Sequence, residues 1–296
     1  HTLKNEISSY ENRFLLRLVG ALDADMCNIY DEQDNFINHE RLFNNPNLGK
    51  KYSYFMEDLN CNYAIPFSLF HQYQREDSFH INQYIKPLED HFVGFDKSKG
   101  NLLPAFIIWD CEKNNYTEIK PKIKKINPIP AGHYGDDWSE SLDKGDKDLI
   151  DKYFSKIKTI TSYIGKIHFN CGSKIHTVNI SKCNTEILFE VPRHSLIEAI
   201  KYNVFDDLMI GNFMRTKLIN TKSLYPYFTP YVAKYYDNGG VKDVGELKSY
   251  FNYYKRKSPS KINFIQDKIM REMKNYTIYN FEQLGLYQFA RFIYRA

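Results

Sequence analysis

The sequence lacks any long apolar run, and no segment approaches the roughly 18 consecutive apolar residues that cross a bilayer. The first residues also lack the basic stretch followed by an apolar one that is typical of a secretory signal. We therefore predict a cytoplasmic protein with no membrane-spanning segment and no membrane partner.

Cysteine is scarce, and neither cysteine nor histidine shows the spacing of a locally encoded metal site. The five cysteines are an odd number, lie far apart and include no C-x-x-C pair. No two of the nine histidines form an H-x-H or H-x-x-x-H pair, which would place two imidazoles on one metal. These absences exclude a zinc site within one short segment, and unpaired thiols are typical of a reducing compartment.

Signatures of nucleotide, nucleophile and nucleic-acid sites are absent as well. The sequence contains no G-x-G-x-x-G, no G-x-x-x-x-G-K-[ST] and no G-x-S-x-G motif. Its 40 Lys and Arg residues face 36 Asp and Glu residues, which leaves a net charge of only +4. Because a dedicated nucleic-acid-binding chain normally carries a large basic excess, we predict no nucleic-acid partner. The lysine-rich stretch 120–125 keeps that role as a weaker alternative.

What is present is typical of a globular protein with two domains. The chain has 296 residues, of which 43% are apolar and 26% charged, so it can bury a sizeable core. We predict one domain over residues 1–143 and a smaller α+β domain over 144–296. The fold class expected for the whole chain is α/β to α+β.

Apolar periodicity predicts the elements of the first domain. Ser8 and Glu11 form a capping box, and the apolar residues of 14–22 recur at helical spacing, so we predict a helix there. Three strands are predicted after it: one over 61–70 that contains Pro66, a buried one over 104–110 and an exposed or edge one over 119–130.

The second domain is predicted to combine helices with a small antiparallel sheet. Apolar residues on one face predict a helix over 144–164, and Ser195 with Glu198 forms a capping box that opens another. An antiparallel meander is predicted from strands 166–171, 174–180 and 185–191, and amphipathic helices are predicted near 261–274 and 281–294.

Polar residues that follow the strand 61–70 form the first candidate site. His71, Arg75 and Asp77 come directly after this strand, where α/β enzymes commonly keep their chemistry. We predict His71 as a metal ligand, Arg75 as a substrate-binding residue and Asp77 as a catalytic carboxylate. The alternative is that His71 only makes hydrogen bonds within a loop.

A second candidate site is the segment Gly135-Asp136-Asp137-Trp138, which joins a glycine turn to two carboxylates and one of the two tryptophans. We predict catalytic roles for Asp136 and Asp137, and substrate binding by stacking for Trp138. The equal alternative is that an aspartate caps a helix while Trp138 packs on the core.

Further candidates lie in the second domain. Asp206 and Asp207 are adjacent, and neighbouring like charges can raise one pKa, so we predict that both bind substrate. Consecutive side chains point in different directions, which leaves capping and surface roles as the alternative. His168 and His176 lie on two strands of the predicted hairpin and are expected to form a cross-strand polar pair.

Scattered segments of the chain resemble a known family. The string Phe205-Asp206-Asp207-Leu208-Met209-Ile210-Gly211 resembles a late segment of CMP-N-acetylneuraminate hydroxylases and their bacterial relatives. Ile65-Pro66-Phe67, followed by Asp77 and by Tyr84-Ile85-Lys86, is similar to the last metallo-β-lactamase-fold strand of that family and the loop behind it. The segment 135–138 falls at a comparable point.

The resemblance implies a metal-dependent hydrolase that acts on a sugar nucleotide or a related acidic metabolite. It also implies a partial metallo-β-lactamase-like αβ/βα layer in residues 1–143, and a divalent metal, either zinc, iron or manganese. The family's H-x-H-x-D-H motif and the paired C-x-H ligands of its Rieske module are missing here. Since the chain begins with His1, we expect a C-terminal portion whose metal is bound only by the full-length protein. The alternative is a non-catalytic α+β module that binds a ligand or partner.

Overall fold

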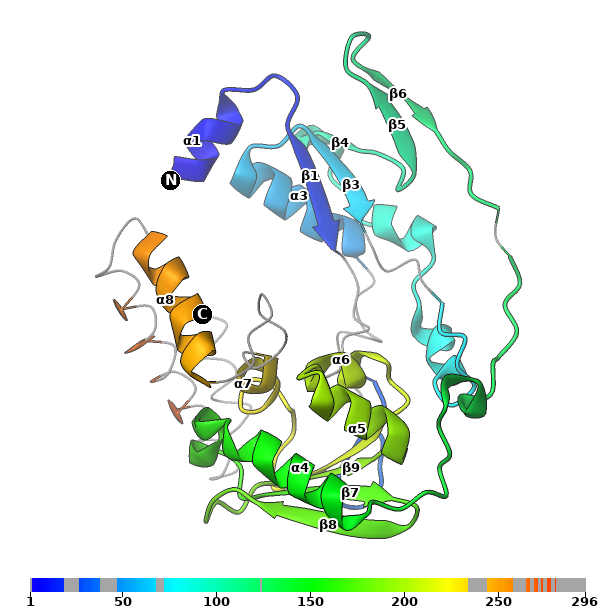
Figure 1. Ribbon diagram of the computed structural model, residues 1–296. Coiled ribbons are helices and arrows are strands. Elements are labelled where there is room, and N and C mark those ends of the chain that lie inside the picture. Colours follow the sequence, from blue (N-terminus) through cyan, green and yellow to red (C-terminus); the bar gives the residue numbers. More distant parts are fainter. Residues whose placement is uncertain are drawn as a thin grey trace. The chain divides into compact units, whose positions relative to one another are not determined.

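The computed structural model describes residues 2–18, 27–37, 47–67, 72–122, 124–233 and 244–257, with isolated helical residues between 265 and 280. The chain forms two compact units, seen in Figure 1. Unit 1 comprises His1–Met26 and Asn38–Ile129, and unit 2 comprises Cys27–Ile37 and Pro130–Ala296. The boundary thus falls at 129/130, where the sequence suggested 143/144.

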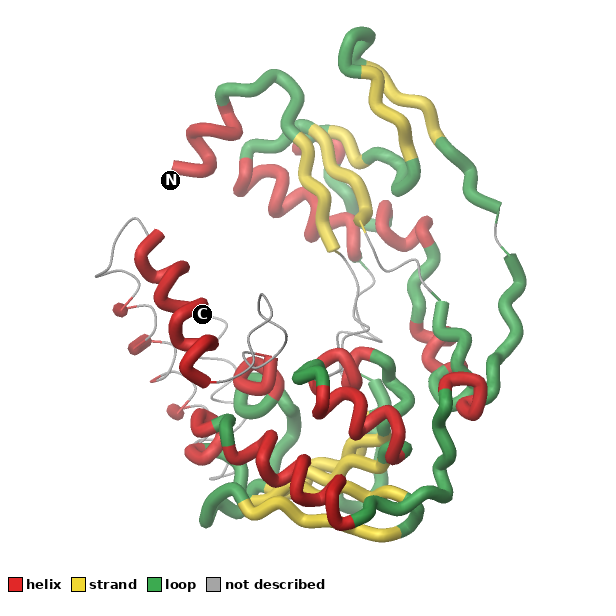
Figure 2. Tube along the Cα trace, viewed as in Figure 1, coloured by secondary structure: helices red, strands yellow, loops and turns green. Residues whose placement is uncertain are grey.

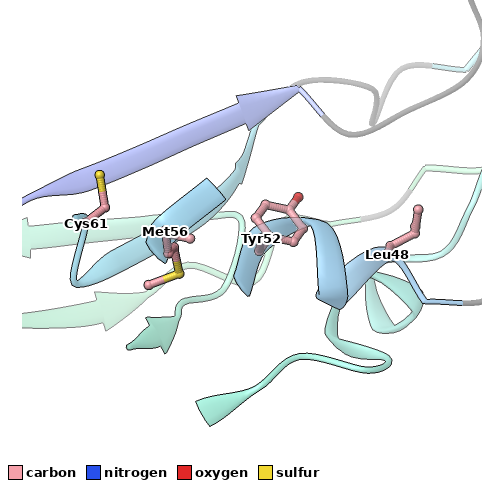
Figure 3. Close-up of a cluster of buried hydrophobic side chains, with 5 residues drawn as sticks. Leu48, Tyr52, Met56 and Cys61 are labelled. Atoms are coloured by element: carbon pink, nitrogen blue, oxygen red, sulfur yellow. The ribbon is translucent and has the colours of Figure 1, made fainter. Parts of the chain in front are cut away.

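Unit 1 is built on a parallel sheet of three strands in the order β1-β3-β4. These strands are β1 (Phe14–Leu18), β3 (Tyr63–Phe67) and β4 (Asn101–Leu102). The helix α3 (Leu48–Leu59) connects β1 to β3 and ends at Asn60 in the left-handed conformation. Its apolar side packs on one face of the sheet, where the buried residues are Leu48, Tyr52, Met56, Cys61 and Ala64 (Figure 3).

The helix predicted over 14–22 is wrong where the structure describes it. The helix α1 (Thr2–Ser8) ends before this segment, and Ser8 donates to the Lys4 carbonyl at its C-terminal end instead of capping an N-terminus. Residues Phe14–Leu18 form β1. A parallel strand needs apolar residues on both faces, so its continuous apolar run resembles a short helical segment.

The second face of this sheet is only partly covered. Trp109 packs against Phe14 and Tyr63, with ring centroids 4.8 and 4.9 Å apart. Further along the same face, Leu18 lies beside Phe67 in the strand register, and both side chains are about half exposed. This face therefore has an apolar surface that the described residues do not bury.

Pro66 lies within a strand, as predicted, and this strand is the central one of the sheet, although proline cannot donate a ladder hydrogen bond. The Ala64 carbonyl accepts from the Leu103 amide, so the backbone N–H and C=O groups of the even-numbered residues of β3 point toward β4. Pairing between β3 and β4 involves only Tyr63 and Ala64. The backbone nitrogen of Pro66 thus points toward β4, where the pairing of the two strands has already ended.

The rest of unit 1 consists of short elements. Three 3₁₀ helices precede β4: η1 (Phe79–Tyr84), η2 (Leu88–Phe92) and η3 (Lys97–Lys99). The hairpin of β5 (Ile107–Asp110) and β6 (Asn115–Glu118) confirms a strand within 104–110, but Ile108 is 61% exposed and the strand is not buried. No strand forms in the described part of 119–130, whose three prolines remove donors.

Unit 2 is built on a mixed sheet of five strands in the order β2-β10-β9-β7-β8. The strands are β2 (Ile29–Tyr30), β7 (Lys166–Cys171), β8 (Lys174–Asn179), β9 (Glu186–Glu190) and β10 (Arg215–Ile219). The predicted antiparallel hairpin of β7 and β8 is confirmed, and its turn residues Gly172 and Ser173 both have positive φ. The third predicted strand, β9, pairs with the other side of β7 and runs parallel to it.

Helices cover one face of this sheet (Figures 1 and 2). They are α4 (Lys144–Ser155), α5 (Arg193–Lys201), α6 (Phe205–Ile210) and α7 (Thr229–Val232). Unit 2 also contains the 3₁₀ turns η4 (Ala131–Tyr134) and η5 (Lys158–Ser162). The helix predicted over 144–164 starts at Lys144 as expected but ends at Ser155. The mixed α/β class of the chain is therefore confirmed.

The C-terminal part of the chain is described only in places. Helix α8 (Val244–Lys257) is described, and so are single helical residues of the segment predicted near 261–274. The helix predicted near 281–294 lies outside the described residues. Within the described part, no helix is both long and apolar enough to cross a bilayer.

Five aromatic rings form the centre of the unit 2 core. Phe205 lies within 6.3 Å, between ring centroids, of each of its four neighbours: Phe154, Phe169, Phe189 and Phe228. All five side chains are almost fully buried. Because α4, β7, β9 and α6 each supply at least one ring, this cluster joins the helices to the sheet.

The substitution Phe205→Ala is expected to destabilise the protein by about 3–5 kcal/mol, since it opens a cavity between all four rings. Tyr202→Ala is a matched control, because Tyr202 is 67% exposed and its removal is expected to cost less than about 0.5 kcal/mol. Urea denaturation measures both. Equal losses for the two variants would contradict the assigned core.

Candidate functional site

Arg75 and Asp77, two of the predicted site residues, pair with each other in unit 1. The Arg75 Nε and Nη2 atoms donate to the two carboxylate oxygens of Asp77 at 2.7 and 3.0 Å, and both side chains are largely buried. This bidentate ion pair occupies both oxygens of the carboxylate that would act as a general base. The backbone of Arg75 also bridges to Ile129, so the pair fastens a loop. The predicted metal ligand His71 lies outside the described residues.

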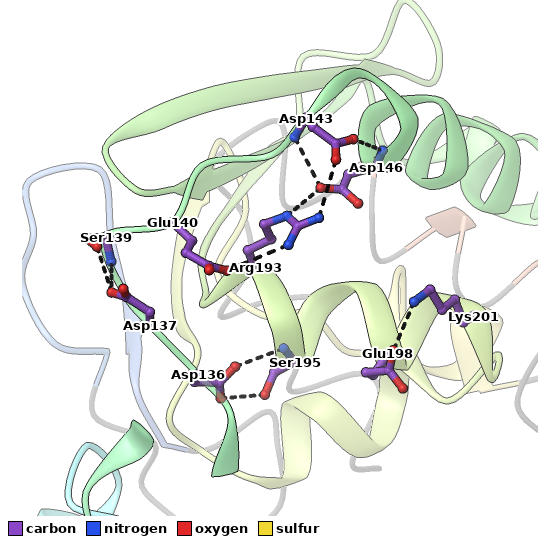
Figure 4. A network of polar contacts seen from close by, with 10 residues as sticks. All are labelled: Asp136, Asp137, Ser139, Glu140, Asp143, Asp146, Arg193, Ser195, Glu198 and Lys201. Carbon is purple, nitrogen blue, oxygen red and sulfur yellow. Dashed lines mark hydrogen bonds and ion pairs between the residues drawn. The ribbon is translucent and has the colours of Figure 1, made fainter. Parts of the chain in front are cut away.

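Asp136 is buried and caps a helix that lies far along the chain (Figure 4). Its Oδ1 accepts from the Ser195 amide at 2.9 Å, and its Oδ2 accepts from the Ser195 hydroxyl at 2.6 Å. The first amides of a helix have no acceptor within the helix, and Asp136 supplies one to α5. Gly135, with φ of +82°, makes the turn before it. Of the two alternatives for this residue, the contacts agree with capping.

The capping box predicted for Ser195 and Glu198 is wrong. Helix α5 already begins at Arg193, after Pro192, so Ser195 lies inside its first turn. Glu198 forms an ion pair with Lys201 at 3.0 Å. The S-x-x-E spacing is correct for a box, but the acceptor for this helix end comes from a distant loop that spacing alone does not reveal.

Asp137 and Trp138 lie on the surface of the same loop. The Asp137 carboxylate accepts from the hydroxyl and the amide of Ser139, and these hydrogen bonds, chiefly that of the hydroxyl, lower its pKa. Trp138 is 40% exposed, so it does not belong to the core. Asp137 thus stabilises a local turn, and the Trp138 indole is accessible from solvent.

Arg193 binds the carboxylates beside this loop (Figure 4). Its Nε donates to Asp146 at 2.6 Å, while its terminal nitrogens lie 3.4 Å from Asp143 and 3.7 Å from Glu140. Asp143 and Asp146 also form the capping box of α4. These acidic residues are engaged in holding α4 and α5 together.

Asp206 and Asp207 lie in the first turn of α6. Burial raises the pKa of Asp206 to about 6, and the neighbouring charge of Asp207 adds to this shift. The ring of Tyr153 is 3% exposed, and burial together with the charge of Asp206 raises the pKa of its hydroxyl. The carboxyl of Asp206 is therefore placed against the core, whereas Asp207 is exposed.

The predicted site residues are divided between the two units. Arg75 and Asp77 belong to unit 1, whereas Asp136, Asp137 and the remaining described candidates belong to unit 2. Within the described part of the chain, no three His, Cys, Asp or Glu side chains come close enough to hold a metal ion. The described candidates do not fit a divalent metal, because most are engaged in the internal contacts above.

A cationic site that the sequence did not indicate lies in unit 1. Arg17, near the carboxyl end of β1, points toward α3 together with Leu15, and its guanidinium stacks 4.1 Å from the centre of the Phe55 ring. Burial lowers the pKa of Arg17. Among the described residues no carboxylate pairs with it, and its buried Nη1 has no hydrogen-bond partner.

Two further polar groups lie beside this guanidinium. The Tyr52 hydroxyl is 3.1 Å from Nδ1 of His91 in η2, and both side chains are buried. Burial raises the pKa of Tyr52, although the charge of Arg17 opposes the shift. Burial likewise lowers the pKa of His91. At neutral pH the tyrosine is therefore protonated and the histidine neutral, so Arg17 supplies the only positive charge of this trio.

An unpaired guanidinium at this place can bind an anion. In open α/β sheets ligands commonly bind beyond the carboxyl ends of parallel strands, and Arg17 is the last residue but one of β1. The sequence pattern does not reveal this site, because the apolar spacing of 14–22 predicts a helix and a single arginine in an apolar run forms no motif. No protein-family model, no curated protein and no solved structure matches this chain.

Replacing Asp136 by alanine is expected to cost about 2 kcal/mol of unfolding free energy, because two partly buried donors of Ser195 lose their acceptor. Asp137→Ala is the matched control on the same loop and is expected to cost less than about 1 kcal/mol. Chemical denaturation compares them. A loss for Asp136→Ala no larger than that of the control would refute the capping role.

Asp206→Asn is expected to change stability in a pH-dependent way. The raised pKa means that ionisation of Asp206 opposes folding, so the penalty is absent below about pH 4 and complete above about pH 6. After allowance for its half-exposed position, the amide should stabilise the fold by on the order of 1 kcal/mol at about pH 7 and not at about pH 4. Unfolding curves at the two pH values test this, with Asp207→Asn as control. A pH-independent difference would disprove it.

Proposed function

We propose that unit 1 is a ligand-binding module for a small anionic metabolite, which binds through its phosphate or carboxylate group to Arg17. The observation that carries the proposal is the half-buried guanidinium of Arg17, which has no anionic partner among the described residues. A sugar nucleotide, or a related acidic metabolite, has the required charge. This function agrees with the non-catalytic alternative derived from the sequence.

The chemistry of arginine supports binding of such a group. A guanidinium presents several donors in one plane, and a phosphate or carboxylate accepts two of them at once. Stacking on Phe55 fixes that plane before the ligand arrives. Partial burial strengthens the attraction, because the local dielectric constant is lower than that of water.

The unsatisfied donor of the unliganded protein also favours binding of an anion at Arg17. A buried donor without an acceptor is costly, and native proteins seldom retain one without a functional reason. An anion at Nη1 would remove this cost. Tyr52, which is hydrogen-bonded to His91, interacts electrostatically with Arg17, and this neutral pair adds no competing carboxylate.

Metal-dependent hydrolysis of such a ligand, the activity that the resemblance implies, is not part of this proposal. The described candidate residues do not fit a metal, and no reaction step is assigned to Asp77, Asp136 or Asp137. The proposal is therefore limited to binding.

Isothermal titration with inorganic phosphate and with a panel of CMP- and UDP-sugars tests the proposal. Replacing Arg17 by glutamine removes charge-assisted hydrogen bonds, so we expect at least about a tenfold loss of affinity for every ligand that binds the native protein. Stability without ligand should be unchanged or higher, since an unpaired partly buried charge is removed.

Arg13→Gln is the matched control, because the Arg13 guanidinium is already satisfied by the Asn60 and Tyr10 carbonyl oxygens. Its ligand affinity should equal that of the native chain. Equal affinity of Arg17→Gln and native protein, an equal loss in the control, or no binding by the native chain would each overturn the proposal.

A further inference from the structure

A second group of reactive side chains lies on the sheet of unit 2, on the face opposite the helices. Side chains alternate along β7, so Ile167, Phe169 and Cys171 are buried while His168 points to the other face. We call this other face the open face. Thr177 lies directly opposite His168 on β8, which is the edge strand.

His168 joins a hydroxyl to a carboxylate on the open face. Its Nδ1 lies 2.8 Å from the Thr177 hydroxyl oxygen, and its Nε2 lies 2.8 Å from a carboxylate oxygen of Glu186 on β9. Lys166 holds the second oxygen of the same carboxylate at 2.7 Å. A hydroxyl, an imidazole and a carboxylate in this order are the parts of an activated nucleophile.

The charges around His168 determine which ring nitrogen carries the proton. The hydrogen bond from Lys166, followed by that from His168, holds the pKa of Glu186 below its ordinary value, so the carboxylate is ionised and accepts. Nε2 of a neutral imidazole then donates to Glu186, which leaves the lone pair of Nδ1 facing Thr177. The hydroxyl therefore donates to His168, as a nucleophile must before it is deprotonated.

We propose that Thr177 is the nucleophile of an acyl-transfer site that accepts an acyl group from an activated ester or thioester. Thr177 Oγ attacks the carbonyl carbon while its proton passes to Nδ1 of His168. The bond to the leaving group breaks, and the leaving oxygen or sulfur takes that proton. Water then attacks the Thr177 ester in the same way, which releases the acid and restores the hydroxyl.

The surroundings of Thr177 permit a substrate to approach. On the same face of β8, Ile175 is 59% exposed and Asn179 is exposed, and Thr177 lies between them. Ile175 offers an apolar surface for the acyl chain, and Asn179 carries a side-chain amide two residues along the same face of β8. The site is built within unit 2 and does not depend on ligand binding at Arg17.

His176 offers a comparison within the same hairpin. It lies opposite Phe169, on the helix-covered face, and its Nε2 is 2.9 Å from a carboxylate oxygen of Asp151 on α4. The two histidines therefore do not pair with each other, contrary to expectation, because the strand alternation places them on opposite faces. His176→Gln is thus a matched control for His168→Gln.

The experiment incubates the full chain with p-nitrophenyl acetate and locates the acetyl groups by peptide mass spectrometry. We expect an acetyl ester on Thr177 that hydroxylamine removes, unlike an acetyl amide on lysine. Thr177→Val should abolish this ester, Thr177→Ser should retain it, and His168→Gln should slow its formation at least about 100-fold. His176→Gln should leave it unchanged.

Circular dichroism checks that each variant is folded. If Thr177→Val does not fold, the serine variant and His168→Gln still decide the question, since the former must be acetylated and the latter must be slow. Acetylation of lysines alone, an ester on other hydroxyls that persists in Thr177→Val, or equal rates in the two histidine variants would overturn the proposal.

Discussion

Helix α3 packs on the sheet of unit 1, where Tyr52 and Met56 of the helix join Ala64 of β3 in one buried cluster. This contact determines where a charged side chain can lie in unit 1. Because side chains alternate along β1, residues on one side of the strand meet the helix and those on the other do not. Arg17 is on the helix side but beyond the apolar centre, where Phe55 can still stack on it. A charged group is thus retained at the margin of a core that otherwise excludes charge.

The same alternation separates structure from chemistry in unit 2. The aromatic cluster around Phe205 occupies the covered face of the sheet, while Lys166, His168 and Glu186 form a continuous polar network on the other. The rigid core fixes the positions of these polar groups, because they belong to adjacent paired strands. A network on two paired strands needs no loop to hold it.

Much of unit 2 could be predicted from the sequence because its signals are local. The hairpin of β7 and β8 follows from alternating residues around Gly172 and Ser173, and the presence of α4 follows from apolar residues on one face of a helix. The first strand of unit 1 could not be predicted, because a short apolar run satisfies a helix and a parallel strand equally well.

The candidate sites were harder to predict than the fold, because contacts distant in sequence determine them. Asp77 and Asp136 are of a residue type that is common in catalytic sites, but their carboxylates accept hydrogen bonds from Arg75 and Ser195, respectively. Conversely, Arg17 and Thr177 belong to no motif and become notable only through their neighbours. A residue type suggests a role, but the groups around it decide whether that role is available.

Pro66 also limits the length of the third strand of the unit 1 sheet. Pro66 has no amide hydrogen to donate toward β4, and the pairing of β3 with β4 ends at Ala64. The hydrogen bond from the Leu103 amide to the Ala64 carbonyl is the last one between them, and the chain leaves the sheet after Leu103. The segment that follows contains Trp109, whose ring packs against the rings of Phe14 and Tyr63. The third strand therefore stays short, and the chain that leaves it covers the rings at the amino-terminal ends of β1 and β3 with an indole instead of a further strand.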